Sequence, residues 1–156
     1  MMSKLSVEKI QDEVRRFWAA LCAKDLVAMR RFYAAGAMVF NSSSSRHELG
    51  PLSVARRQRE YFQRNTKMRV DLGDIHVMLL GEHGESAVAS YTLHFHATDV
   101  STMAGAVMED LHECRASHVF AYGPDGHLYI MHEHVSLPVK SAAGVSTGTH
   151  TAFAAR

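Results

Sequence analysis

The second half of the chain is dominated by segments in which apolar and polar residues alternate. After residue 68, four such segments follow one another, over 69–80, 85–97, 106–122 and 127–137. Alternation of this kind, rich in β-branched and aromatic residues, is typical of strands that bury one face. The glycine-bounded breaks between the later segments are short enough for tight turns, so we expect consecutive strands to be antiparallel neighbours.

The first 65 residues instead repeat apolar residues at intervals of three and four. This spacing predicts helices over 5–22, 25–33 and 51–65, with a short strand over 37–40. Asp25 has the side chain expected of an N-cap. Helices followed by strands indicate an α+β fold, in which the helices cover one face of a single sheet.

Composition excludes several classes of function. The chain has 156 residues, with 17 Lys+Arg against 16 Asp+Glu, so it has the length of one domain and gives no general case for nucleic-acid binding. No apolar run approaches the roughly 20 residues of a membrane span, and no signal peptide is recognisable. Cys22 and Cys114 fit neither a disulfide framework nor zinc spacing. We expect a cytoplasmic domain over 1–138 and an Ala/Ser/Thr/Gly-rich tail over 139–156.

Alternation also assigns side chains to the two faces of the sheet. In 85–97 the odd residues, including Tyr91, form the more apolar face and should point inward. In 106–122 the even residues do so, including His118. The last segment divides less clearly, and we place His134 and Ser136 on the inward face. The outer face keeps apolar residues as well, which predicts a homodimer.

The 11 histidines of the chain raise the question of acid–base chemistry. An imidazole in an apolar pocket has its charged form disfavoured, so it stays neutral and can accept a proton. With His118 and His134 in one cavity, one ring could act as base. The other ring, Tyr91 or Asn41 would then donate to an enolate oxygen, which suits enolisation, aldol cyclisation or dehydration. The structural alternative is that a histidine on the last strand only satisfies a buried carbonyl or holds Ser136 in place.

Two further patterns have simpler interpretations. His94-x-His96 and His132-x-His134 have the spacing of zinc ligands on a strand, but our assignment places the two pairs on opposite sides of the sheet, so we expect no metal. The basic stretch over 56–69 is interpreted as the solvated face of the third helix. No cofactor motif is present, and we expect no cofactor.

Several segments resemble the nuclear transport factor 2-like superfamily. The opening carries the resemblance in Phe17-Trp-Ala-Ala-Leu-Cys-Ala-Lys-Asp-Leu26 and Phe32-Tyr-Ala-Ala-Gly-Ala-Met-Val-Phe40. Arg115-Ala-Ser-His-Val-Phe120, a Gly-Pro-Asp-Gly turn and His132-Glu-His-Val-Ser136 are similar to the SnoaL-like, polyketide cyclase-type branch. The resemblance covers roughly 5–138. It implies a cone-shaped roll, with a bent antiparallel sheet wrapped around three N-terminal helices and a pocket between them.

The resemblance also implies where function would lie. By the resemblance, the catalytic tyrosine, base and oxyanion-hole aspartate of ketosteroid isomerases fall on Phe17, Asn41 and His118. None of these residues can play the corresponding role, so that mechanism is not expected here. We expect a cofactor-independent cyclase, isomerase or dehydratase acting on a carbonyl-bearing substrate, with His118 and His134 as catalytic residues. The alternative is a non-catalytic ligand-binding or homo-oligomeric assembly module. The pocket for an apolar or polycyclic small molecule would be lined by Phe17, Trp18, Asn41, Tyr91 and Ser136.

Overall fold

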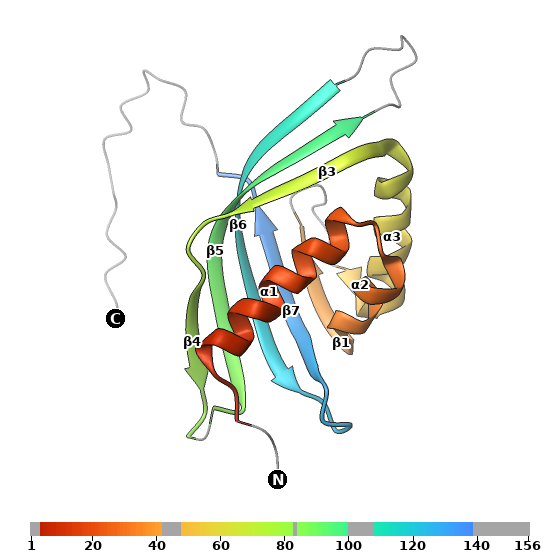
Figure 1. Cartoon of the computed structure of the whole chain (residues 1–156). Coiled ribbons are helices and arrows are strands. Elements are labelled where there is room, and N and C mark those ends of the chain that lie inside the picture. Colours follow the sequence, from red (N-terminus) through yellow and green to blue (C-terminus); the bar gives the residue numbers. More distant parts are fainter. Residues whose placement is uncertain (1–3, 42–47, 83, 100–107, 139–156) are drawn as a thin grey trace, which may run out of the picture.

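The computed structural model describes residues 4–41, 48–82, 84–99 and 108–138 (Figure 1). In this part of the chain three helices cover one seven-stranded sheet, so the prediction of an α+β fold is confirmed. The tail expected over 139–156 lies outside the described residues. The elements in chain order are α1 (Val7–Cys22), α2 (Leu26–Phe32), β1 (Tyr33–Phe40), β2 (Glu48–Leu49), α3 (Gly50–Arg64), β3 (Asn65–Leu72), β4 (His76–Leu80), β5 (Ser86–Asp99), β6 (Met108–Tyr122) and β7 (Leu128–Ser136).

The sheet follows the order β2-β1-β7-β6-β5-β3, with β4 also paired to β5. The pairs β4–β5, β5–β6 and β6–β7 are antiparallel, so the prediction that consecutive strands are antiparallel neighbours is confirmed. The first strand, β1, instead runs parallel to the last, β7. The first and last strands of the described fold are therefore neighbours in the sheet.

The single strand predicted over 69–80 is two strands on the same edge of β5. Leu72 pairs with Leu93 and His76 pairs with Ser90, and a break separates the two strands. At the break the amide of Gly73 donates to the Thr92 carbonyl at 2.9 Å. A Cβ at this position would lie 2.7 Å from the Thr92 hydroxyl oxygen, so only glycine allows so close an approach.

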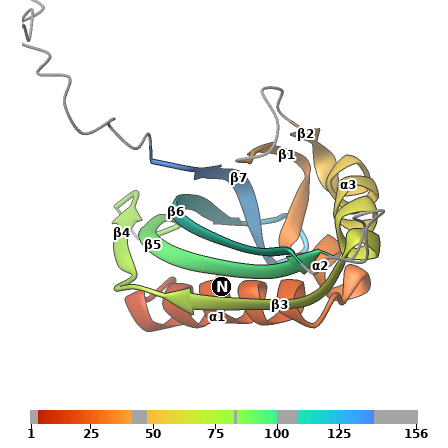
Figure 2. The same ribbon diagram turned by 90° about the horizontal axis from the view of Figure 1, so that it is seen from above.

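The sheet curves around the helices to form the expected cone. Figure 2 shows the curvature, with α1 lying below β5 and α3 beside β1 at one edge of the sheet. Ile10, Val14 and Phe17 of α1 are buried in one core with the inward residues of β5, β6 and β7. The longest described helix, α1, has 16 residues and an amphipathic pattern, and no helix in the described ranges could span a bilayer.

The helix boundaries follow local capping. The side chain of Ser6 accepts a hydrogen bond from the Lys9 amide at 3.2 Å, and Asp25 accepts one from the Ala28 amide at 2.9 Å. The prediction that the second helix extends through Tyr33 was wrong. Tyr33 begins β1, because it pairs with Ile130 of β7 and its ring enters the core.

A β-bulge in β7 changes the face of every later residue in that strand. Phe120 pairs with Ile130 and Val119 pairs with His132, so Met131 is an extra residue with no partner across the strand. Glu133 and Val135 consequently point inward, while His132, His134 and Ser136 lie on the outer face. The predicted faces of β5 and β6 are confirmed, and the inward placement of His134 and Ser136 was wrong.

Candidate functional site

His118 lies in the middle of β6 and is 0% exposed. Three aromatic rings surround its imidazole, with centroids 4.9 Å away for Phe17, 5.8 Å for Tyr91 and 5.7 Å for Phe120. Its two nitrogens face different polar groups. Nδ1 is 3.4 Å from the Tyr91 hydroxyl, and Nε2 is 3.1 Å from Oε2 of Glu133.

Glu133 is the second buried ionisable group, at 6% exposed. The bulge at Met131 places it opposite His118 in the register between β6 and β7. Its Oε2 accepts a hydrogen bond of 2.9 Å from the Tyr33 hydroxyl. The contact with His118 is at hydrogen-bond distance but lacks the alignment of a hydrogen bond, so we treat it as mainly electrostatic.

Trp18 extends this set from α1. Its indole N–H donates to the Tyr91 hydroxyl at 2.6 Å, so the indole fixes the hydroxyl beside the imidazole. Five buried side chains thus form one continuous series, which we call the interior polar chain: Trp18, Tyr91, His118, Glu133 and Tyr33. Residues from α1, β5, β6, β7 and β1 all contribute to it.

The two tyrosines of the interior polar chain are held in their protonated form. Burial raises the pKa of Tyr33 well above its usual value, and the charge of Glu133 and the hydrogen bond to it raise it further. Burial also raises the pKa of Tyr91, although the hydrogen bond from Trp18 acts in the opposite direction. Both hydroxyls therefore remain available as donors.

The groups around His118 indicate which of its two ring nitrogens carries the hydrogen. An ionised carboxylate only accepts, so Glu133 can receive the Tyr33 hydroxyl and face an N–H at Nε2 of His118. Nδ1 is then the nitrogen with a free lone pair, and it faces the Tyr91 hydroxyl. This tautomer is assigned from the contacts. It leaves His118 able to accept a proton at Nδ1.

Arg57 brings a positive charge towards this site from α3. Its guanidinium is half-buried and lies 3.9 Å from a carboxylate oxygen of Glu48. Burial lowers the pKa of Arg57, and the charges of Glu48 and then Glu133 act against that shift. Arg57 thus differs from the solvated helix face that we predicted for the basic stretch, because its charge is coupled electrostatically to Glu133.

The other predicted site residues lie elsewhere. His134 is exposed on the outer face, with its ring centroid 6.0 Å from that of Phe40. Ser136 pairs with Arg115 on the same face, and Asn41 follows the end of β1, half-buried and outside the interior polar chain. The structure therefore brings Phe17, Trp18 and Tyr91 together with His118, but does not bring His134, Ser136 or Asn41 into that group.

Sequence reasoning missed Glu133 and Tyr33. An inserted bulge residue moved Glu133 inward, and Tyr33 was assigned to a helix. The sequence feature that could have identified Glu133 is a carboxylate within an otherwise largely apolar strand. A buried carboxylate of that kind needs partners, and a tyrosine and a histidine are suitable ones.

The two His-x-His pairs both lie on the outer face, which corrects their predicted placement on opposite sides. His96 contacts Asp71, with 3.2 Å between Nε2 and the carboxylate oxygen, while His132 packs 6.2 Å from Phe40 between ring centroids. In the described part of the chain, no three His, Cys, Asp or Glu side chains gather as metal ligands.

A separate open groove of about 1430 Å³ runs along one side of α1, from Lys9 to Ala20, and is bounded by α2, the start of β1 and the β6–β7 turn. We call it the hairpin-end groove. Tyr33 is both a lining residue of this groove and a member of the interior polar chain. The groove and the buried imidazole are therefore separated by Tyr33 and Glu133.

Comparison with known proteins supports the architecture. Residues 10–140 match the family model of the SnoaL-like domain. A nuclear transport factor 2-like superfamily protein from Salmonella enterica has a similar structure, with a TM-score of 0.74, 20% identity, and coverage of 88% of this chain and 94% of that chain. A proposed dehydratase of the NTF2-like family from Streptomyces avermitilis gives a TM-score of 0.71, 16% identity, and coverage of 86% and 97%.

A third similar structure contains a ligand. It is a protein from Catenulispora acidiphila in complex with S-DNPA, with a TM-score of 0.64, 14% identity, and coverage of 82% of this chain and 90% of that chain. The chain matches no curated protein. At these identities the solved structures establish the fold alone. The match over residues 10–140, together with the cone of sheet and helices, shows that the chain belongs to the SnoaL-like domain family.

Proposed function

We propose that this protein is a cytoplasmic, cofactor-independent enzyme of the cyclase, isomerase or dehydratase type, with His118 as its acid–base group. The observation that carries the proposal is the interior polar chain. An imidazole and a carboxylate buried side by side cost stability unless they are compensated, and such groups concentrate at functional sites. The proposed dehydratase and the ligand complex among the similar structures support a role in small-molecule chemistry.

The proposed step is proton transfer next to a carbonyl group. Nδ1 of His118 takes the proton from the carbon beside the carbonyl, and the electron pair of that C–H bond forms the double bond of an enolate. The Tyr91 hydroxyl, held by Trp18, donates to the enolate oxygen. Glu133 and Tyr33 stabilise the imidazolium that results.

Three different reactions can follow formation of the enolate. Return of the proton to a different carbon gives an isomer. Attack of the enolate carbon on a second carbonyl closes a ring, and His118 then gives its proton to the alkoxide that forms. Loss of a β-hydroxyl gives a double bond. In the last case His118 returns its proton to the departing oxygen as water. Since His118 has no exposed surface, the substrate must displace a surrounding aromatic ring such as that of Phe17 to reach Nδ1, while Trp18 keeps the Tyr91 hydroxyl beside the imidazole.

The test uses 2-tetralone, a bicyclic ketone, in D₂O with proton NMR. We expect the protein to accelerate exchange of the protons beside the carbonyl, and His118→Gln to remove about 100-fold or more of that acceleration. His134→Gln, on the outer face, is the matched control and should keep the wild-type rate. Equal rates in wild type and His118→Gln would reject the catalytic role.

We also propose that the outer face of the sheet joins two copies of the chain. Met38 and Phe40 of β1 and Leu49, which pairs with Met38, lie on neighbouring strands with 48%, 38% and 58% of their surface exposed, so large apolar side chains gather at one place. A second copy with the same face would cover them symmetrically. Phe40→Glu should convert a dimer to a monomer in analytical ultracentrifugation, and a monomeric wild-type protein would contradict the proposal.

A further inference from the structure

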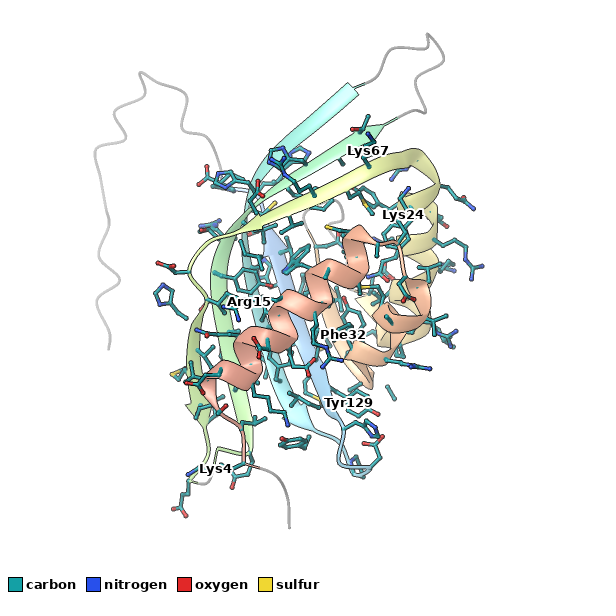
Figure 3. All side chains as sticks on the ribbon, in the orientation of Figure 1. Lys4, Arg15, Lys24, Phe32, Lys67 and Tyr129 are labelled. Atoms are coloured by element: carbon teal, nitrogen blue, oxygen red, sulfur yellow. The ribbon has the colours of Figure 1, made fainter. Side chains whose placement is uncertain are left out.

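The hairpin-end groove is formed by side chains that the proposed acid–base chemistry does not use. Figure 3 labels Phe32 below α1 and Tyr129 near the β6–β7 turn, and both residues line the groove. Its volume of about 1430 Å³ exceeds the roughly 300–1,000 Å³ of common small-ligand pockets. Its lining extends from Lys9 to Ala20 along α1 and onto residues 122–131 around the β6–β7 turn, so it suits an extended ligand better than a compact one.

Short side chains keep the walls of the groove apart. Five alanines contribute to them from α1, α2 and the start of β1: Ala19, Ala20, Ala28, Ala34 and Ala35. Larger apolar groups complete the lining, including Phe32, Leu128 and Met131. A ligand lying along this surface would bury mostly carbon, which favours an apolar body.

The acidic side chains of the groove already have partners, whereas two of its basic side chains have none in the part of the chain that the structure describes. The acids are already engaged: Glu13 pairs with Arg16 at 2.8 Å, and Asp125 accepts from the Tyr129 hydroxyl at 2.6 Å. That hydrogen bond lowers the pKa of Asp125, so it stays ionised and directed towards the turn. Lys9 in turn donates to the Tyr122 hydroxyl at 2.7 Å.

Arg30 and Arg31 remain exposed at the end of α2. Neither guanidinium makes a hydrogen bond or ion pair with any residue in the described ranges. Two guanidinium groups beside an apolar surface can bind a carboxylate through paired N–H donors. The two positive charges favour an anionic group, and the carbon-rich walls favour an apolar body, so both features point to an apolar ligand with a carboxylate.

We propose that the hairpin-end groove binds an elongated apolar molecule with a terminal carboxylate, which Arg30 and Arg31 hold at the end of α2. The apolar body lies along the alanines between α1 and α2 and reaches Leu128 and Met131. This site does not depend on the chemistry proposed for His118. Tyr33 alone is shared, and its hydroxyl is directed to Glu133 and away from the ligand.

The probe is 11-(dansylamino)undecanoic acid, whose fluorescence rises in an apolar environment, compared with its methyl ester. We expect the acid to bind at least about tenfold more tightly than the ester, because the ester has no carboxylate and cannot form the charge-assisted hydrogen bonds to the two guanidinium groups. The double variant Arg30→Gln/Arg31→Gln should weaken binding of the acid by a similar factor and leave binding of the ester unchanged. Added salt should weaken binding of the acid but not that of the ester.

The matched control removes two positive charges from other surfaces. Arg15, paired with Asp12 on α1, and Arg64, stacked over Tyr61, do not line the groove. Arg15→Gln/Arg64→Gln should therefore bind the acid like the wild type. Ala28→Leu should weaken acid and ester alike by filling the groove, and thermal unfolding would establish that each variant is folded.

Three results would overturn the proposal. They are absence of binding by the acid, equal affinity for acid and ester, and unchanged affinity in both Ala28→Leu and the Arg30/Arg31 double variant. His118→Gln separates this site from the proposed enzyme. Acid binding that persists in His118→Gln, with or without ketone exchange in the wild type, supports the groove independently.

Discussion

The neighbouring strands β6 and β7 both carry histidines, but only β6 buries one. In β6 strict alternation places His118 inside, with Ser117 and Val119 on the other face. In β7 the bulge at Met131 turns both histidines outward and replaces them inside with Glu133. One inserted residue therefore decided which ionisable group entered the core, and it changed a predicted pair of imidazoles into an imidazole and a carboxylate.

The two faces differ in what their polar groups contribute. Inside, each polar group depends on a specific partner, because an unpaired buried group loses its hydration without compensation. Outside, water can replace any partner, so single substitutions there have small effects. The following predictions measure this contrast, from the largest effect to the smallest.

Glu133→Ala should be the most damaging of these changes. It leaves His118 and the Tyr33 hydroxyl buried without their acceptor, and breaking a buried pair in this way costs about 3–5 kcal/mol. The free energy of unfolding in urea measures the loss. If Glu133→Ala were as stable as wild type, the interior polar chain would have no energetic role.

Alkaline pH should destabilise the protein through its two buried tyrosines. Their folded pKa values lie above the unfolded value of about 10, so the unfolded chain loses these protons first. Their stabilising contribution is complete below about pH 10 and falls above it by about 1.4 kcal/mol per pH unit for each tyrosine.

Urea titrations between pH 9 and pH 11 would measure this slope. Tyr33→Phe and Tyr91→Phe should each make it shallower, even though each variant is less stable at neutral pH. Tyr129→Phe is the comparison for an exposed tyrosine: its pKa is raised mainly by the hydrogen bond to Asp125, and because water screens that surface interaction the slope should change less than in the two buried variants. A slope that is identical in all four proteins would contradict the assignment.

The fold could be predicted from the sequence because its signals are periodic. The period of α1 and the alternation of β5 and β6 each extend over many residues, so a single exception such as Val88, an apolar residue on the outer face of β5, does not hide the pattern. Phe17, Trp18, Tyr91 and His118 were correctly grouped for this reason. These four residues lie on elements with uninterrupted periods.

The missing part of the site depended on features without a local signal. A bulge residue such as Met131 is an ordinary apolar residue, and only the pairing with β6 reveals that it is extra. Tyr33 was assigned to the end of a helix because the parallel partner that draws it into a strand lies about 100 residues later. The hairpin-end groove likewise combines four distant segments.

Trp18→Phe should have an intermediate effect within the core. The indole is replaced by a smaller ring, and the Tyr91 hydroxyl loses the donor that holds it at 2.6 Å. We expect a loss of about 1–3 kcal/mol, the cost of a buried polar group left unsatisfied. Denaturation monitored by circular dichroism is the appropriate measurement, since the substitution removes the single tryptophan of the chain.

His134→Ala should have the smallest effect of the series. The ring is exposed and packs 6.0 Å, between ring centroids, from Phe40 on the same face. At a protein concentration low enough to keep the chain monomeric, stability should change by less than about 0.5 kcal/mol. A loss comparable to that of Glu133→Ala would mean that the outer face is as tightly organised as the core.

The parallel pairing of β1 with β7 has a consequence for how the chain acquires its structure. Tyr33 and Glu133 are bonded across a separation of 100 residues, so the hydrogen-bonding edge of an early strand waits for the last strand to be synthesised. Long-range closure of this kind slows folding. Until then the early helices have an incomplete surface to pack against, and a nascent chain that stalls before residue 128 would be a natural substrate for chaperones.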